Sequence, residues 1–292
     1  MSAEKISIRF FNDREVRAVW DEAQNKWWFC IVDIAGVLSG SVDPANYWYV
    51  LKSRLKKAES QLLTICKGFK LTAKDGKRRL MDCLDSDGVV RLAKEFPGNK
   101  ASAFLDWFLY SENTVDGQSR KKAYALFGSG VMESLEPGSV KCLQQIHGYL
   151  FGGLYDFAGQ IRTKNISKGG FTFAPWQHLA NSLSVIERMP EMTFEEIVDK
   201  YVEMIVEHPF MEGNGRSTRI WLDLMLKRSL KRCVDWSKVD KRAYLEAMRM
   251  SVSDSATLKA LIEPVLTEKI NDREMFMKGI DYSYYYEEPE ER

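Results

Sequence analysis

The chain opens with strand-like alternation and changes to helical spacing further on. Ile6, Ile8 and Phe10 alternate with polar residues, the period-two pattern of a half-buried strand. Residues 16–20 and 27–30 flank a polar turn and predict a hairpin, and Asp75-Gly76 predicts the turn of another. The helices predicted in this part are 33–38, 44–57, 86–96 and 99–110. Together these elements predict an α+β unit of about 110 residues, an ordinary domain size.

A polar stretch, SENTVDGQSRKK at 111–122, separates this unit from a second half with helical spacing. We place the boundary there, which predicts domains at 1–113 and 114–292. The helices predicted in the second half are 140–161, 176–188, 194–208, 216–230, 240–250 and 255–279. Between the first two, 163–173 contains Gly169-Gly170 and ends in Phe-Thr-Phe, which predicts a short hairpin. The whole chain is therefore predicted to be α+β, with a mostly helical second domain.

Composition narrows the class of protein. The formal net charge is only +1, which argues against nucleic-acid binding through overall charge. The N-terminus has no apolar signal core, and no apolar run reaches the roughly 18 residues of a membrane span. The five cysteines are odd in number and far apart, which favours neither a disulfide framework nor a zinc site. We expect a cytoplasmic protein in a reducing compartment, without a membrane span.

The segment around residue 208 carries the first sign of chemistry. Thr193 and Glu196 form a capping-box pattern, and apolar residues follow at helical spacing. His208 continues the buried face of this predicted helix, and Pro209 should end the helix near that point. An imidazole at the end of a buried face can accept a proton from an attacking hydroxyl.

A predicted anion site follows directly. Gly213 and Gly215 permit close backbone approach to a ligand, and the N–H groups of a helix start favour anions. Arg216 and Arg219, three residues apart, share one side of that helix and suit a polyphosphate. Glu212 adds a carboxylate that suits Mg²⁺ held jointly by protein and phosphates.

Each part alone has an ordinary structural explanation: a satisfied histidine at a helix end, a Gly-Asn-Gly turn, solvated arginines and a surface acid. Their occurrence within 208–219 instead favours phosphoryl or nucleotidyl transfer.

The segment 208–219, HPFMEGNGRSTR, resembles the signature of the Fic (Fic/DOC) family, His-x-Phe-x-Asp/Glu-Gly-Asn-Gly-Arg-x-x-Arg, at every defined position. Residues 154–162 resemble the family's helix before its flap. The segment 165–170 resembles the family's flap hairpin; its residues are Asn165, Ile166, Ser167, Lys168, Gly169 and Gly170. The resemblance extends over roughly 114–292.

This resemblance implies a protein adenylyltransferase that moves AMP from ATP to a Ser, Thr or Tyr hydroxyl, with Mg²⁺. It implies that His208 is the general base, that Phe210 anchors the loop and that Glu212 holds the metal. The implied phosphate-binding residues are Gly213, Asn214, Gly215, Arg216 and Arg219. The flap would dock the target chain by strand pairing, and the protein itself is a possible target.

Near the C-terminus, Ser283 to Glu288 resembles the family's inhibitory pattern, Ser/Thr-x-x-x-Glu-Gly/Asn, with Glu288 at the last position. The resemblance implies that Glu287 pairs with Arg219 and that Ser283 belongs to the same device. The alternative is an acidic, frayed tail. The aromatics Tyr284 to Tyr286 could join an interface of a homo-oligomer.

A basic concentration lies in the first domain. Residues 52–79 contain ten Lys and Arg, at 52, 54, 56, 57, 67, 70, 74, 77, 78 and 79. Such a patch can bind DNA, although solvated helix and hairpin faces explain it equally well. Residues 5–110 also resemble the Bro-N domain, which is often linked to DNA binding.

Two other functions stay open. The chain could be a non-catalytic, nucleotide-sensing DNA-binding regulator or toxin–antitoxin component, although an intact His208 favours catalysis. It could also transfer another group, such as UMP, phosphocholine or phosphate.

Overall fold

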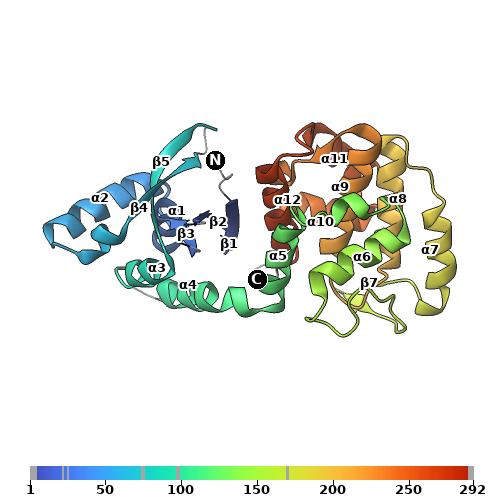
Figure 1. Ribbon diagram of the computed structural model, residues 1–292, viewed down its shortest axis with the longest axis horizontal. Coiled ribbons are helices and arrows are strands. Elements are labelled where there is room, and N and C mark those ends of the chain that lie inside the picture. The colour runs from blue at the N-terminus through green and yellow to red at the C-terminus, as the bar shows by residue number, and fades with distance from the viewer. Residues whose placement is uncertain are drawn as a thin grey trace. The chain divides into compact units, whose positions relative to one another are not determined.

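The computed structural model describes residues 5–21, 23, 24, 26–73, 76–96, 99–168 and 171–288. The chain divides into two units between Thr114 and Val115, one residue after the boundary that the sequence predicts. Each unit is described by itself (Figure 1). Strands and helices both occur, and the α+β class predicted from the sequence is confirmed.

An antiparallel five-stranded sheet with the order β1-β2-β3-β5-β4 forms the first unit. The strands are β1 (Lys5–Phe11), β2 (Arg14–Asp21), β3 (Lys26–Cys30), β4 (Lys67–Thr72) and β5 (Arg78–Leu84). The helices are α1 (Ile31–Ser39), α2 (Pro44–Lys57), η1 (Gln61–Ile65), α3 (Ser86–Ala93), α4 (Asn99–Tyr110) and η2 (Ser111–Asn113). The larger of two core clusters joins apolar side chains of strands and helices, and in it the rings of Phe29 and Phe108 lie 4.7 Å apart.

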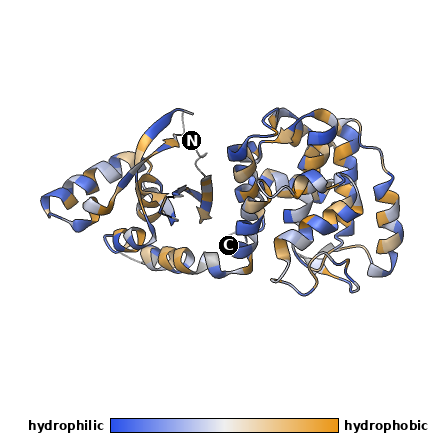
Figure 2. Cartoon of the chain, in the orientation of Figure 1, coloured by the Kyte–Doolittle hydropathy of each residue, from blue (hydrophilic) through white to orange (hydrophobic). Residues whose placement is uncertain are grey.

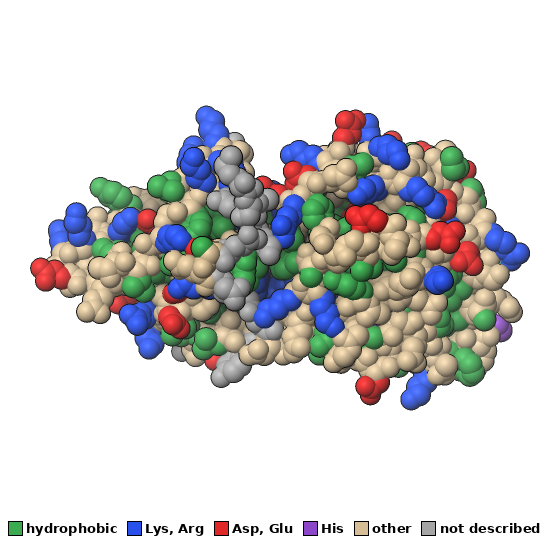
Figure 3. Space-filling model, viewed as in Figure 1, with side chains coloured by type: hydrophobic (Ala, Val, Ile, Leu, Met, Phe, Trp, Pro, Cys, Tyr) green, Lys and Arg blue, Asp and Glu red, His purple; other side chains and the backbone are tan. Residues whose placement is uncertain are grey.

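The basic segment of this unit lies on α2, β4 and β5, where Lys and Arg side chains reach the surface (Figure 3). Part of its charge is already paired: Lys52 contacts Asp82 and Lys67 contacts Asp21, each at 2.5 Å. The basic residues classed as exposed are Arg54, Lys56, Lys57, Lys70, Lys77, Arg78 and Arg79. Residue 74 lies outside the described part. DNA binding and the Bro-N resemblance stay predictions.

The second unit is mostly helical. Its α-helices are α5 (Val115–Leu126), α6 (Val140–Phe151), α7 (Leu179–Glu187), α8 (Phe194–Glu207), α9 (Asn214–Leu230), α10 (Lys241–Met250), α11 (Ala256–Ile262) and α12 (Arg273–Tyr285). The 3-10 helices are η3 (Met132–Ser134), η4 (Trp176–His178), η5 (Trp236–Lys238) and η6 (Glu263–Val265). Two short hairpins pair β6 (Ser167–Lys168) with β7 (Phe171–Thr172), and β8 (Cys233–Val234) with β9 (Leu266–Thr267).

Helix α9 is the centre of this unit. It packs against α6, α8 and α12, and its Trp221 and Met225 side chains have no exposed surface. The surrounding helices carry hydrophobic residues on one side and hydrophilic residues on the other (Figure 2). Because α9 is enclosed in this way, Asn214, Arg216 and Ser217 of its first turn are buried.

Two sequence predictions about the helices of this unit are wrong, those for 140–161 and 255–279. The polar stretch 111–122, where the sequence predicts the domain boundary, contains the division between the two units, and most of this stretch lies in α5. Its buried positions include Ser119 and Arg120, so the buried face of α5 does not show an apolar period.

The predicted helix 140–161 ends at Phe151, and the segment 154–162 is a series of turns. Gly153 and Gly159 adopt positive φ there, a conformation that a helix cannot contain.

The predicted helix 255–279 is two helices, because Pro264 interrupts the first and Asp272 caps the start of α12. Helix α12 then continues to Tyr285, so Ser283 lies in a helix. Of the acidic tail 287–292, only Glu287 and Glu288 are described, and Glu287 is paired with Arg219.

Tyr284 and Tyr286 are also buried, at 4% and 3% exposure, and their hydroxyls form hydrogen bonds within the unit. The prediction that these two side chains join the interface of a homo-oligomer is therefore wrong, whereas for the half-buried Tyr285 it stays a prediction.

Within the described ranges, no helix combines the length and the apolar character needed to cross a bilayer.

Candidate active site

His208 stands where α8 ends. A complete capping box of Thr193 and Glu196 starts this helix, as predicted from the sequence. His208 terminates it in the left-handed region, at φ 49°. Its Nδ1 lies 3.1 Å from the carbonyl oxygen of Ile205. Because a carbonyl only accepts hydrogen bonds, this contact assigns a proton to Nδ1 and makes Nε2 the basic nitrogen of the neutral ring.

The turn after His208 is closed by reciprocal hydrogen bonds. The Asn214 side chain accepts from the Phe210 N–H and donates to the Phe210 carbonyl, both at 2.8 Å. Phe210 is fully buried. Gly213 has φ +82°, and an added Cβ would lie 2.5 Å from the Phe151 ring, so only glycine fits. The Asn214 side chain thus shapes the loop and sets the start of α9.

A buried histidine supports this loop from below. The His147 ring stacks on Phe210 with centroids 3.9 Å apart. Its Nδ1 accepts from the Gly159 N–H at 2.8 Å, and its Nε2 lies 2.9 Å from the Glu212 carbonyl. Burial lowers the pKa of His147 to about 4. His147 is therefore neutral at physiological pH, with its proton on Nε2.

Arg216 is buried at 3% exposure and is held by two carboxylates. It contacts Asp116 of α5 through Nη1 and Glu212 through Nη2, the latter at 2.9 Å. Its guanidinium carbon lies 4.9 Å from the Phe151 ring centroid and 5.5 Å from that of Tyr284. Its Nε is buried without a hydrogen-bond partner among the described residues.

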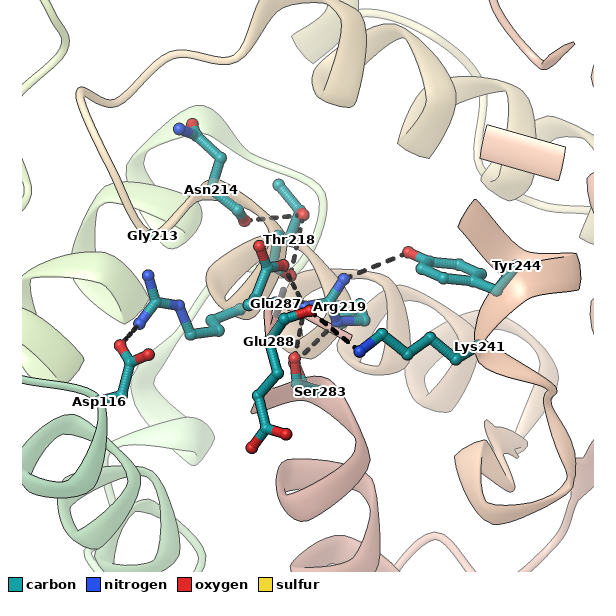
Figure 4. Close-up of polar contacts among 12 residues, drawn as sticks. Asp116, Gly213, Asn214, Thr218, Arg219, Lys241, Tyr244, Ser283, Glu287 and Glu288 are labelled. Carbon is teal, nitrogen blue, oxygen red and sulfur yellow. Dashed lines mark hydrogen bonds and ion pairs between the residues drawn. The ribbon is translucent and has the colours of Figure 1, made fainter. Parts of the chain in front are cut away.

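Arg219 is held by the C-terminal helix. Its Nε donates to the Ser283 Oγ and its Nη2 to the Ser283 carbonyl, each at 2.7 Å. Nη2 also pairs with Glu287 Oε1 at 2.6 Å (Figure 4). Burial opposes the charged form of Arg219, but Tyr244 and Glu287 outweigh it and raise its pKa.

The Glu287 carboxylate also lies at the start of α9. An added Cβ on Gly215 would meet Glu287 Oε1 at 2.1 Å, which only glycine avoids. One of the chain's own carboxylates is therefore held at a helix N-terminus, beside a buried arginine. A helix N-terminus and a guanidinium group both stabilise an anion.

Glu212 meets the requirements of a magnesium ligand at a phosphate site. Its side chain is 45% exposed, and its Oε1 accepts from the Gly213 N–H at 3.0 Å. The described residues contain no cluster of three or more metal-binding side chains. A single carboxylate nevertheless suits Mg²⁺, which takes most of its ligands from phosphates and water.

The predicted flap forms the β6–β7 hairpin, in which Ser167 pairs with Thr172 and Lys168 with Phe171. Ile166 accepts from the Phe173 N–H at 3.3 Å, and the Asn165 side chain accepts from the Trp176 N–H at 3.0 Å. Gly169 and Gly170 lie outside the described residues. The Phe173 ring stacks on His208 with centroids 3.7 Å apart, so the hairpin lies against the candidate base.

The sequence did not single out His147 or Asp116, and it assigned no role to Arg162. A lone histidine among the apolar residues of 140–151 was the available signal for His147. Nothing local could indicate Asp116, because its partner Arg216 is 100 residues away.

Comparisons with known proteins match the same region. Residues 137–226 match the model of the Fic/DOC family. Protein adenylyltransferase VbhT of Bartonella schoenbuchensis is 30% identical over 154 residues, which cover 48% of this chain and 32% of VbhT. Probable protein adenylyltransferase y4lH of Sinorhizobium fredii is 28% identical over 156 residues, which cover 48% of this chain and 81% of y4lH.

Among solved structures, BepC of Bartonella tribocorum with bound AMPPNP is similar to this chain. The match has a TM-score of 0.44 and 20% identity, and covers 53% of this chain and 87% of BepC. The matched part thus spans most of y4lH and BepC but only about a third of VbhT. The signature at 208–219 lies inside the region that matches the family model. Residues 137–226 of this chain therefore carry a domain of the Fic/DOC family.

Proposed function

We propose that this chain is a protein adenylyltransferase, which transfers AMP from ATP to a Ser, Thr or Tyr hydroxyl of a protein. The observation that carries the proposal is His208, whose Nε2 is the basic nitrogen, on the loop that leads into α9 and its two buried arginines. The similarity to protein adenylyltransferase VbhT and probable protein adenylyltransferase y4lH supports the same activity.

The proposed step is a displacement at the α-phosphorus. The target hydroxyl oxygen forms a bond to this phosphorus as the bond to the β-phosphate oxygen breaks, and pyrophosphate leaves. His208 Nε2 takes the hydroxyl proton. The N-terminus of α9, Arg216 and Arg219 stabilise the phosphate charge. Glu212 would hold Mg²⁺, which supplies neutralisation of the phosphate oxygens when bound.

We also propose that the described state is autoinhibited. The Glu287 carboxylate lies where a phosphate would meet Arg219 and the start of α9, so ATP and Glu287 compete for the same groups. Asp116 is a second such carboxylate, because it holds Arg216. With Glu212, the two arginines face three carboxylates, and a polyphosphate has to displace two of them, which weakens its binding.

Helix α5, which carries Asp116, and helix α12, which Glu287 follows by two residues, are joined to each other. Tyr284 donates to Ser119 at 2.9 Å, and Tyr124 contacts Asp281. This linkage supports the view that they form one inhibitory element.

Mass spectrometry of purified protein after incubation with ATP and Mg²⁺ tests the activity. We expect Glu287→Gly to gain the mass of one AMP, and Glu287→Gly with His208→Ala to gain none. Parallel incubations with UTP and with CDP-choline separate AMP transfer from transfer of UMP or phosphocholine. ATP binding without any mass gain, with the protein alone or with a cell lysate as target, would favour a non-catalytic nucleotide sensor.

A further inference from the structure

Arg162 lies between the flap and the turn that carries His208. Its side chain is buried at 3% exposure and belongs to neither the signature nor the hairpin. Nε donates to the His208 carbonyl at 2.7 Å, and Nη2 donates to the Glu207 carbonyl at 3.0 Å. The Arg162 main-chain N–H donates to the Pro209 carbonyl at 2.8 Å. Arg162 therefore contacts three consecutive carbonyls around the end of α8.

The same guanidinium closes the base of the flap. Nη1 donates to the Lys164 carbonyl at 2.7 Å, and Nη2 donates to the Ala174 carbonyl at 2.5 Å. Lys164 precedes β6 and Ala174 follows β7, so one side chain holds both ends of the hairpin. All four acceptors are main-chain carbonyls, which lie in three separate stretches of chain.

This arrangement needs an arginine. A guanidinium presents five N–H donors in a planar fork, and four carbonyls use them here. A lysine ammonium has three donors on one atom, so it cannot reach all of these carbonyls. Burial lowers the pKa of Arg162, yet the group stays charged because no arginine deprotonates under ordinary conditions.

The His208 backbone needs such support. A non-glycine residue at φ 49° is strained, and it persists only where neighbouring contacts determine its conformation. Arg162 fixes the main chain of His208, while Phe173, directly before Ala174, packs on the His208 ring. Backbone and ring are thus both set by the base of the flap.

We propose that Arg162 is a positioning residue that couples the flap to His208, so that a target chain seated on the flap and the base that deprotonates it share one rigid frame. This inference rests on the proposed adenylyl transfer. It assigns Arg162 a role in the rate of transfer and none in binding ATP. The residues predicted to bind ATP are Gly213 and residues of α9, and Glu212 is the predicted metal ligand.

The test compares Arg162→Lys with Arg188→Lys, both in the Glu287→Gly background. Arg188 is a matched control, since it donates to the Ser184 carbonyl from the exposed end of α7. We expect Arg162→Lys to lower the transfer rate at saturating ATP by about 10- to 100-fold, with ATP affinity unchanged. We also expect faster hydrogen–deuterium exchange of the 163–173 amides, whereas Arg188→Lys should change neither quantity.

An unchanged rate with unchanged flap exchange would overturn the proposal, and so would a loss of ATP affinity as large as the loss of rate. The exchange measurement needs no transfer, so it tests the coupling even if the Glu287→Gly protein proves inactive, an outcome that counts against the proposed function alone. Should Arg162→Lys fail to fold, Phe173→Leu removes the ring contact with His208 and should also lower the rate without changing ATP affinity.

Discussion

Replacing Glu287 with glycine is the most informative single perturbation of this site. The Nη2 atom of Arg219 and Oε1 of Glu287 are 2.6 Å apart, with side chains 4% and 18% exposed. The mutation removes this carboxylate but leaves Ser283 and Tyr244 in contact with Arg219. Arg219 then stays in place, and its charge becomes available to a phosphate.

The expected rise in transfer rate follows from the ion pair between Arg219 and Glu287, which ATP no longer has to displace in the mutant. A hydrogen bond to a charged group contributes about 1.5–3 kcal/mol net. At about 1.4 kcal/mol per factor of ten, this corresponds to a rise of roughly 10- to 150-fold in transfer at subsaturating ATP. Glu287→Gln keeps the shape but removes the charge, so its activity should lie between wild type and Glu287→Gly.

The assay is the initial rate of label transfer from α-labelled ATP, measured over a range of ATP concentrations. Glu288→Gly is the control, because it removes the neighbouring carboxylate and keeps the main-chain carbonyl that accepts from Lys241 at 2.9 Å. Equal rates for wild type and Glu287→Gly, with equal ATP affinity, would refute the competition between Glu287 and phosphate.

Three further predictions concern the loop and its supports. Asp116→Asn should raise the transfer rate of the Glu287→Gly protein by a further two- to fivefold, roughly. The rise should be smaller at high salt, because Asp116 is 58% exposed. A fall in the transfer rate would instead mean that Asp116 orients Arg216 productively. The unfolding free energy should fall by up to about 3 kcal/mol as pH drops from 6.5 to 4, because only the unfolded chain protonates His147 in that window. His147→Gln, which keeps a donor and an acceptor, should flatten this dependence in denaturant titrations, and an unchanged slope would exclude His147 as its source. Gly213→Ala should lower stability by about 1–3 kcal/mol in the same titrations, because its Cβ meets the Phe151 ring, and an unaltered midpoint would contradict that clash.

The features that the sequence predicts well are local. The capping box fixes the start of α8 within a few residues, and Pro209 marks its end. The loop 208–219 is contiguous, so its glycines and arginines indicate an anion site without knowledge of the fold. The pairing of Glu287 with Arg219 spans 68 residues and was reached only through the family resemblance.

The features that the sequence does not predict depend on contacts between distant residues. Helix α5 buries polar side chains because Tyr284 and Asp281 of α12 satisfy them, so hydrophobic periodicity cannot reveal it. Arg162 acts through the carbonyls of four other residues, and carbonyls are present at every position of a chain. Such supports become visible only when the backbone is in place.

The contacts of the two site histidines have a spectroscopic consequence. The chain has only three histidines, His147, His178 and His208. His147 accepts at Nδ1, whereas the contact of His208 assigns a proton to that same atom, so the two neutral rings are opposite tautomers. The nitrogen spectrum of histidine-labelled protein should therefore separate them without further mutation. The signal of His208 would then report the protonation of the candidate base directly. The signal of His147 would serve as an internal reference, because His147 stays neutral down to about pH 4.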